Sequence, residues 1–335
     1  MLLDANLPPV TLHQIPALAQ AAESIGFSAL WSTETLHDPF LPLGLIAEHS
    51  QRLHFGTAVA VAFARSPATL AYTAWDLADS SRGRFILGLG TQVRAHIVRR
   101  FGMPWPDSPA GKLREMIGAI RALWEAWQEG GSLDFQGEHY NLNLMTPFFN
   151  PGPIDHPQVP IYIAGVNTGL CRLAGEVADG MLAHPYHSVR YLQEVVRPAV
   201  AAGAARAGRD PALIHVAVTA LVATTQDEAE FARSQIAFYA STPSYRPVMA
   251  LHGWGEVADQ LRALARGGEW GEMGGRITDE MLHTFAVVAP EDELAATLRR
   301  RYAGLADRLS LYLPFSPGER DNFWRNLAAE LQDAG

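Results

Sequence analysis

The segment from Val159 to Leu182 has the residue types of a phosphate-binding turn. A short apolar run from Val159 to Ala164 predicts a strand that is buried on both faces. Gly165 and Gly169 allow a close backbone turn, and Asn167 or Thr168 can cap the helix that the apolar spacing up to Val177 predicts. Free N–H groups at the start of a helix bind anions such as phosphate. The same pattern also fits a βα turn that binds nothing, and this segment alone leaves both interpretations open.

A second turn of this kind follows another predicted strand, Arg84 to Leu89, with Gly88 and Gly90 at its carboxyl end. It is not a dinucleotide-binding fingerprint, because Val93 stands where the third glycine belongs and no helix begins at once. Its position is more informative than its composition. Two glycine-bearing turns each follow a strand in a chain of alternating strands and helices, and in a TIM barrel such strand ends form the active-site face.

Acidic and histidine side chains at other strand ends are candidates for proton transfer. Glu34 ends a short predicted strand, where a carboxylate is costly unless it has a partner or a task. His37 lies three residues further on, and a histidine suits general acid–base catalysis, although a surface histidine fits equally well. His184 and His187 follow another strand without a carboxylate or third ligand at a useful spacing. We therefore predict no metal site.

Strands and helices alternate along the whole chain, which predicts a (β/α)8 TIM barrel, with a doubly wound open sheet as the alternative. The eight strands are expected at Leu2–Ala5, Ala29–Trp31, Leu53–Ala62, Arg84–Leu89, Pro160–Ala164, Gly180–Ala183, Ile214–Ala223 and Leu309–Leu313. The helices are expected at Ile15–Ser24, Leu41–His49, Pro67–Asp79, Ala110–Glu129, Asp227–Ala240, Glu291–Ala303 and Asn322–Leu331.

Two segments interrupt this alternation, after the fourth and the seventh strand. Residues 129–159 contain a hairpin-like piece, Phe135–Leu142, followed by a loop rich in proline and asparagine, and we expect this insertion on the catalytic face. Residues 241–286 contain Trp254, Trp270 and several glycines. No linker separates these segments from the rest, so residues 1–335 are expected to form a single domain.

Composition narrows the class of protein. The 335 residues are 48% hydrophobic, enough for a large core, and the net charge of −9 argues against sequence-independent binding of nucleic acid. The one cysteine, Cys171, excludes an internal disulfide. No apolar run has the length of a membrane span, and the N-terminus has no secretory signal pattern. A cytoplasmic protein without membrane partners is expected.

Several blocks of the chain together resemble the bacterial luciferase-like monooxygenase superfamily, in the branch that uses the deazaflavin coenzyme F420. They are residues 26–34 (GFSALWSTE), 55–67 (FGTAVAVAFARSP), 81–90 (SRGRFILGLG), 174–180 (AGEVADG) and 237–245 (AFYASTPSY). The last block and residues 100–105 (RFGMPW) resemble a narrower group of actinobacterial F420-dependent oxidoreductases. The resemblance implies a TIM barrel, a homodimer, and a coenzyme bound at the carboxyl ends of the strands.

The resemblance also implies site residues. A bulge with a non-proline cis peptide, Ala58-Val59, is expected to lie behind the flat coenzyme ring. Arginine near the glycine turn suits the phosphate and oligoglutamate tail of F420, both anionic. The expected cofactor-binding residues are Thr57, Ala58, Val59, Gly88, Gly90, Thr91, Gln92, Arg100, Ala164, Gly165, Val166, Asn167 and His184.

One departure from the family pattern affects the predicted chemistry. Many relatives carry histidine directly after the acidic residue, and F420-dependent sugar-phosphate and alcohol dehydrogenases are expected to use it as the base. Here Thr35 follows Glu34, so Glu34 or His37 is the candidate proton donor or acceptor. We predict hydride transfer between F420 and a small organic substrate. The alternatives are a monooxygenase that uses reduced FMN and a non-catalytic barrel relative. The aromatic segment Phe238–Tyr245 either lines the substrate pocket or packs the second insertion onto the barrel.

Overall fold

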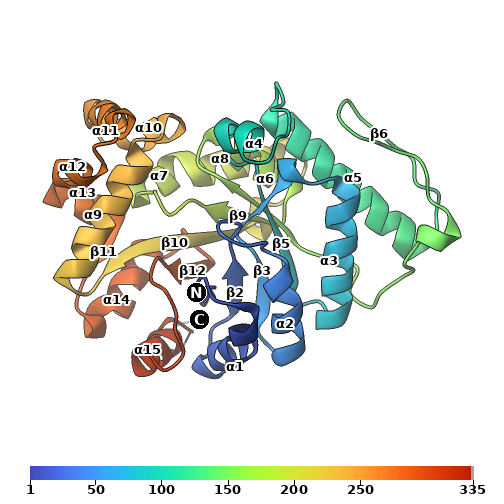
Figure 1. Cartoon of the computed structure of the whole chain (residues 1–335), viewed down its shortest axis with the longest axis horizontal. Helices are drawn as coiled ribbons and strands as arrows, with labels where there is room; N and C mark the ends of the chain where they lie inside the picture. Colours follow the sequence, from blue (N-terminus) through green and yellow to red (C-terminus); the bar gives the residue numbers. More distant parts are fainter. Residues whose placement is uncertain (333–335) are drawn as a thin grey trace.

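Eight parallel strands close into a barrel in the computed structural model, which describes residues 1–332 (Figure 1). The TIM barrel is confirmed and the open sheet is wrong, because β9 pairs with β10 and β12 pairs with β1 to complete the circle. The barrel strands, in order around it, are β1 (Leu2–Asn6), β2 (Ala29–Ser32), β3 (His54–Thr57), β5 (Phe85–Gly90), β8 (Ile161–Gly165), β9 (Gly180–Ala183), β10 (His215–Ala223) and β12 (Arg308–Leu311).

Helices surround the barrel and bury their apolar faces against it, as their helical spacing predicts. Those expected from the sequence agree within a few residues. They are α1 (Ile15–Ile25), α2 (Leu41–His49), α3 (Pro67–Ser81), α5 (Pro109–Glu129), α6 (Thr168–Val177), α9 (Gln226–Ala240), α14 (Glu291–Tyr302) and α15 (Asp321–Gln332).

One helical connection, between β9 and β10, was absent from the sequence prediction. It consists of α7 (Val189–Tyr191), a π-helical turn (Leu192–Val196) and α8 (Arg197–Arg206). Its alanine- and glycine-rich sequence gives α8 almost no amphipathic pattern. Glycine allows the close packing of α8 on α6, because a Cβ on Gly203 would lie 1.9 Å from the Arg172 carbonyl oxygen of α6. The two helices therefore pack backbone against backbone.

The expectation that residues 129–159 lie on the catalytic face is wrong, although their hairpin forms, with β6 (Phe135–Gln136) antiparallel to β7 (Asn141–Leu142). The hairpin is bound to the outer side of α5, where the Glu115 carboxylate accepts the backbone N–H groups of residues 138–140 at 2.5–3.1 Å. The returning loop is bound to α3, since Trp75 donates its indole N–H to the Gly152 carbonyl at 3.1 Å. A connection from helix to strand begins at the opposite end of the barrel, and the hairpin turns back along the outer side of α5 (Figure 1).

The second insertion folds into short helices beside α9 (Figure 1). A short strand, β11 (Ala286–Val288), ends this segment and pairs in parallel with the carboxyl end of β10. The helices are α10 (Arg246–Ala250), α11 (Gly255–Gly267), α12 (Trp270–Met273) and α13 (Asp279–Phe285).

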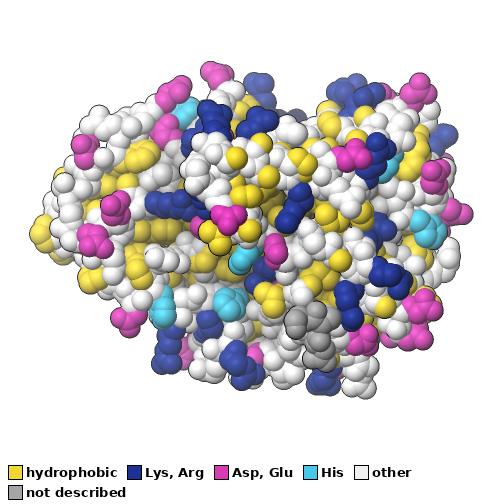
Figure 2. Space-filling model, turned by 180° about the vertical axis from the view of Figure 1, so that it is seen from behind, with side chains coloured by type: hydrophobic (Ala, Val, Ile, Leu, Met, Phe, Trp, Pro, Cys, Tyr) yellow, Lys and Arg dark blue, Asp and Glu magenta, His cyan; other side chains and the backbone are white. Residues whose placement is uncertain are grey.

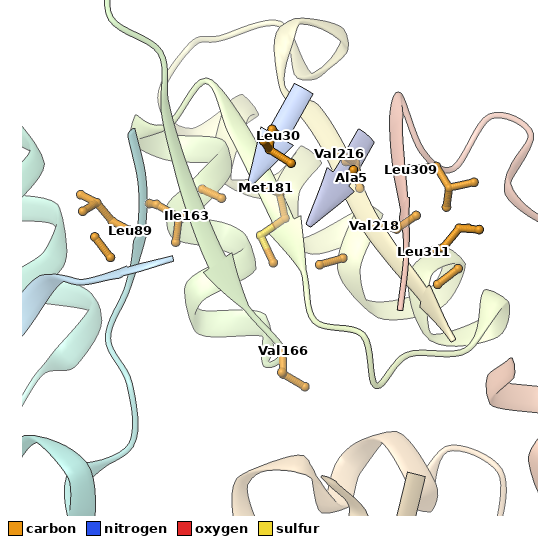
Figure 3. Packing of buried hydrophobic residues seen from close by; sticks show 14 of the residues in the cluster. Ala5, Leu30, Leu89, Ile163, Val166, Met181, Val216, Val218, Leu309 and Leu311 are labelled. Carbon is orange, nitrogen blue, oxygen red and sulfur yellow. The ribbon is translucent and has the colours of Figure 1, made fainter. Parts of the chain in front are cut away.

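The outward-facing residues of the barrel strands form the main core. Figure 3 shows Leu30, Ile163, Met181 and Leu309 from four different strands among these buried side chains. Because side chains alternate along a strand, the residues between them point into the barrel.

The interior of the barrel is closed toward the amino ends of the strands. Asp4 accepts two hydrogen bonds of 2.8 Å from Arg308 and one of 2.9 Å from the Trp31 indole. The Tyr162 hydroxyl lies 2.9 Å from Nδ1 of His215. These aromatic and charged groups fill the lower part of the barrel, so only its carboxyl end remains available for a ligand.

The surface shows no single charged region on the face seen in Figure 2, where acidic and basic side chains are interspersed. None of the helices formed by residues 1–332 combines the length and the apolar character that a membrane crossing requires.

Candidate active site at the carboxyl ends of the strands

The Ala58-Val59 peptide bond is cis, as the resemblance predicts. It lies in a bulge between β3 and the two-residue strand β4 (Ala60–Val61), where the sequence pattern indicated one continuous strand. The bulge is bound from both neighbouring strands. The Ala58 N–H donates to the Ser32 carbonyl at 2.7 Å, and the Thr57 hydroxyl donates to the Gly88 carbonyl at 2.6 Å. Thr57 also accepts the Gly88 N–H at 3.0 Å.

Thr57 was expected to bind the cofactor, but its side chain is fully buried and both of its hydrogen bonds go to Gly88. We therefore assign it to positioning the bulge. Gly88 and Gly90 are required for the same reason. A Cβ on Gly88 would lie 1.7 Å from the Thr57 carbonyl oxygen, and one on Gly90 would lie 2.6 Å from Cγ2 of Val59.

Glu34 lies two residues after β2, in the bend that follows it, and its carboxylate has a charged partner. Its carboxylate, 7% exposed, accepts the Val61 N–H at 2.7 Å and Nη1 of Arg65 at 2.6 Å. Arg65 also donates to the Val61 carbonyl at 3.3 Å and to Asp38 at 3.2 Å. The pair thus holds both backbone polar groups of Val61, directly after the bulge. This geometry favours a positioning role for Glu34 over the predicted proton transfer.

His37 and Arg100 lie at the rim. The His37 side chain is exposed on the loop between β2 and α2. Arg100 donates to the Thr35 carbonyl of the same loop at 2.7 Å, and its guanidinium lies 4.9 Å from the centroid of the Phe101 ring. Arg100 thus joins the segment after β5 to the loop after β2 and stays exposed. Arg100 directly follows α4 (Arg94–Arg99), a short helix that itself carries basic residues.

Thr91 and Gln92 form the turn after β5. The Thr91 hydroxyl donates to the Gln92 carbonyl at 3.2 Å, and Oε1 of Gln92 accepts the Val93 N–H at 2.9 Å. Gln92 has φ +58°, a left-handed conformation that non-glycine residues adopt rarely and often at functional sites.

The turn between β8 and α6 leaves the start of the helix open. A Cβ on Gly165 would lie 2.7 Å from that of Leu170, so the chain turns tightly here. The Asn167 amide donates to the Ser244 carbonyl at 2.9 Å and does not cap α6. The first N–H groups of α6 therefore have no side-chain acceptor. A Cβ placed on Gly169 would have no atom within 4 Å, so the space beside this turn is open. This is the geometry that a phosphate needs.

Val166 and Ala164 belong to the same turn but differ in exposure. Val166 is buried, and its carbonyl accepts the Tyr191 hydroxyl at 3.2 Å, so its side chain is not available to a ligand. Ala164 is half-buried, and the alternation along β8 directs it into the barrel, where Ala58 of the bulge also packs. Together with Gly88 on the intervening strand β5, they give the barrel end a wall of small residues beside the bulge. A planar ring fits such a wall.

His184 ends β9 within an aromatic cluster. Its ring centroid lies 4.7 Å from that of Tyr239 and 4.6 Å from that of Tyr245. Burial, together with the neighbouring His187, lowers the pKa of His184 to about 3, so its ring is neutral at physiological pH. Nδ1 accepts the Tyr186 N–H at 3.1 Å, which leaves the ring proton on Nε2. His184 is thus a hydrogen-bond donor at the barrel mouth.

His187 has a structural position. Its Nδ1 donates to the His184 carbonyl at 2.8 Å, and its Nε2 accepts the Tyr302 hydroxyl at 3.1 Å. Burial lowers its pKa to about 4. Within residues 1–332 no three His, Cys, Asp or Glu side chains are grouped so as to hold a metal ion.

Tyr312 is a candidate that sequence reasoning missed. Its hydroxyl lies 2.9 Å from that of Tyr239 and donates to Oε1 of Gln235 at 3.2 Å. The available signal was the alternation along β12: Arg308 and Ser310 point into the barrel, so the next such residue is Tyr312.

Comparison with known proteins identifies the family of the chain. The family model for luciferase-like monooxygenases matches residues 3–308. An uncharacterized protein of Mycobacterium tuberculosis, Rv1360, is 49% identical, with 92% of each chain covered. A 5,10-methylenetetrahydromethanopterin reductase of Methanolobus tindarius is 30% identical, with 87% of each chain covered.

Two solved structures share the fold. The coenzyme F420-dependent tetrahydromethanopterin reductase of Methanopyrus kandleri has a TM-score of 0.79 at 21% identity, covering 98% of this chain and 97% of that one. The type II Baeyer-Villiger monooxygenase of Pseudomonas putida, solved with FMN, has a TM-score of 0.69 at 15% identity, covering 99% and 97%. The chain belongs to the luciferase-like monooxygenase family.

Proposed function

We propose that the protein is an F420-dependent oxidoreductase that transfers a hydride between this coenzyme and a small organic substrate. The observation that carries the proposal is the set of groups at the barrel mouth. The bulge at Ala58-Val59 and the small residues Gly88 and Ala164 suit a flat ring, and the open start of α6 suits a phosphate. The 30% identical reductase is a sequence relative with a redox activity in its name.

F420 supplies hydride chemistry at its deazaflavin ring when it is bound. The chain's own residues would hold and orient it. Glu34 and Arg65 fix the bulge, the N–H groups of α6 receive a phosphate, and Nε2 of His184 donates a hydrogen bond at the mouth. Arg100 and the other exposed basic residues of α4 suit the anionic tail of F420.

The alternative is a monooxygenase that uses reduced FMN, since the same fold binds FMN in a distant relative. FMN carries a phosphate but no oligoglutamate tail, so the arginines of α4 favour F420. A non-catalytic relative is disfavoured because the bulge, its clamp and the open turn are all present. The homodimer and the cytoplasmic location stay predictions.

The test is a pair of fluorescence titrations of the purified protein, one with oxidised F420 and one with FMN. We expect F420 to bind at least tenfold more tightly. Arg100→Gln should weaken F420 more than FMN, whereas Arg266→Gln, a change at an exposed arginine of α11, should alter neither. Tighter binding of FMN would replace the proposal by the monooxygenase, and binding of neither would overturn both.

A further inference from the structure

The helix α9 has two apolar faces, and only one of them is explained by the core. Its buried face packs into the protein through small and aliphatic residues, namely Ala229, Ala232, Ile236 and Ala240. Phe231 and Phe238 lie on the opposite side at helical spacing, and the half-buried Gln235 and Tyr239 lie between the two faces. Phe231 and Phe238 are each 49% exposed. An aromatic face of this kind on a helix indicates a ligand-binding surface.

This aromatic face of α9 lies at the mouth of the barrel. Phe231 stacks on Tyr312, with ring centroids 6.2 Å apart, and Tyr239 lies 4.7 Å from His184. Tyr312 and His184 follow the carboxyl ends of β12 and β9, so the face borders the same opening as the bulge. Phe238 extends the aromatic face to the exposed Trp270 of α12, 6.1 Å away.

The two tyrosine hydroxyls at this surface are arranged in a chain. A tyrosine hydroxyl has one proton, and Tyr312 donates its proton to Oε1 of Gln235 at 3.2 Å. In the 2.9 Å hydrogen bond between the two hydroxyls, Tyr239 is therefore the donor. Burial and the neighbouring Tyr312 raise the pKa of Tyr239, which keeps it protonated as a donor. A substrate oxygen that replaces Gln235 would receive the Tyr312 proton, and the hydrogen bond from Tyr239 would stabilise the charge left on Tyr312.

We propose that α9 and Tyr312 form the substrate site for planar, conjugated carbonyl compounds, with Tyr312 as the proton donor to the carbonyl oxygen. This proposal rests on the proposed function for its reductant, reduced F420. A hydride adds to an electrophilic carbon of the conjugated system, and the displaced π electron pair moves to the carbonyl oxygen. That oxygen forms a bond to the Tyr312 proton as the Tyr312 O–H bond breaks. A proton from solvent then restores the tyrosine.

The structure explains why Tyr312, rather than Glu34 or His37, is the proton donor in this proposal. The Glu34 carboxylate is already bound to Arg65 and to the Val61 N–H, and His37 lies in solvent on its loop. Tyr312 is half-buried, lies directly after the carboxyl end of β12, and is bordered by the rings of Phe231 and Tyr239.

The first arm of the test measures binding of a probe, benzylideneacetone, by calorimetry without any cofactor. We expect Tyr312→Phe to weaken binding about 2- to 10-fold, as the loss of one hydrogen bond does, and Phe238→Ala to weaken it to a similar extent. Phe148→Ala, at a phenylalanine 89% exposed in the loop after the hairpin of the 129–159 insertion, is the matched control and should change nothing. Unchanged binding in both test variants would overturn the proposal.

The second arm measures single-turnover hydride transfer from reduced F420 to the same probe. Tyr312→Phe should slow transfer about 100-fold and abolish the solvent deuterium isotope effect, because the transferred proton is lost, while the Kd of F420 stays unchanged. Retention of the isotope effect in this variant would exclude Tyr312 as the donor. If the wild-type protein does not bind F420, the proposed function fails, but the first arm still decides whether this surface binds a conjugated carbonyl.

Discussion

Oε2 of Glu34 lies 2.6 Å from Nη1 of Arg65, and this ion pair spans the bulge that follows β3. Glu34 comes from the bend after β2 and Arg65 from the turn before α3. Both contact Val61, one through its N–H and the other through its carbonyl. The pair therefore acts as a clamp that lets the backbone leave the regular strand pattern where a cofactor ring would lie.

We expect Glu34→Gln to weaken this clamp, because the amide still accepts the Val61 N–H but no longer neutralises Arg65. The free energy of unfolding, measured with urea, should fall by about 2 kcal/mol. Glu319→Gln, at an exposed glutamate, is the control, and it should lower the free energy of unfolding by less than about 0.5 kcal/mol. Unchanged stability and cofactor affinity with a large loss of hydride-transfer rate would show instead that Glu34 transfers the proton.

Gly88→Ala should be strongly destabilising, because its Cβ would lie 1.7 Å from a backbone oxygen that cannot move away freely. We expect a loss of at least about 3 kcal/mol or failure to fold. Gly44→Ala in α2 is the matched control, since nothing lies within 4 Å of its Cβ, and it should be neutral or slightly stabilising. Equal effects of the two changes on the melting temperature would contradict the close approach of β3 and β5.

Asp4→Asn should leave the Arg308 charge buried without its partner. The loss is expected to be about 3–5 kcal/mol, the range for breaking a buried ion pair. Replacing both residues by apolar ones, as in Asp4→Leu with Arg308→Met, should restore part of this loss because no isolated charge remains. Urea unfolding of the three proteins measures the difference. A double variant no more stable than Asp4→Asn would contradict this account of the barrel floor.

His187 should make stability depend on pH. Its pKa is lowered from an ordinary value of 6.5 to about 4, so between these values the unfolded chain binds a proton that the folded protein does not. Stability is therefore full above about pH 6.5 and falls as the pH drops, by about 1.4 kcal/mol per pH unit for one proton. His187→Gln should make the dependence of unfolding free energy on pH between 6.5 and 4.5 less steep by about 1.4 kcal/mol per pH unit, while His184, whose pKa is also lowered, still contributes a slope. Parallel curves for the two proteins would contradict the assignment.

Much of the site was predictable because strand ends are visible in the sequence. The carboxyl ends of parallel strands meet at one end of a barrel, so the sequence predicts that Gly88, Gly90, Gly165 and Asn167 lie together. The roles within that set were less predictable. The sequence predicts that Thr57 binds the cofactor, but its hydroxyl is bound to Gly88. It predicts that Glu34 transfers a proton, but its carboxylate is bound to Val61 and Arg65.

The sequence by itself determined the alternation of strands and helices, and with it the barrel, because the periods of apolar residues follow directly from helix and strand geometry. It did not determine which polar groups would find partners within the protein, since those partners lie far apart along the chain. Only the tertiary structure paired Glu34 with Arg65, placed the 129–159 segment outside α5, and brought Tyr312 within 2.9 Å of Tyr239. Contacts between distant segments depend on how helices and strands pack, which local patterns do not encode.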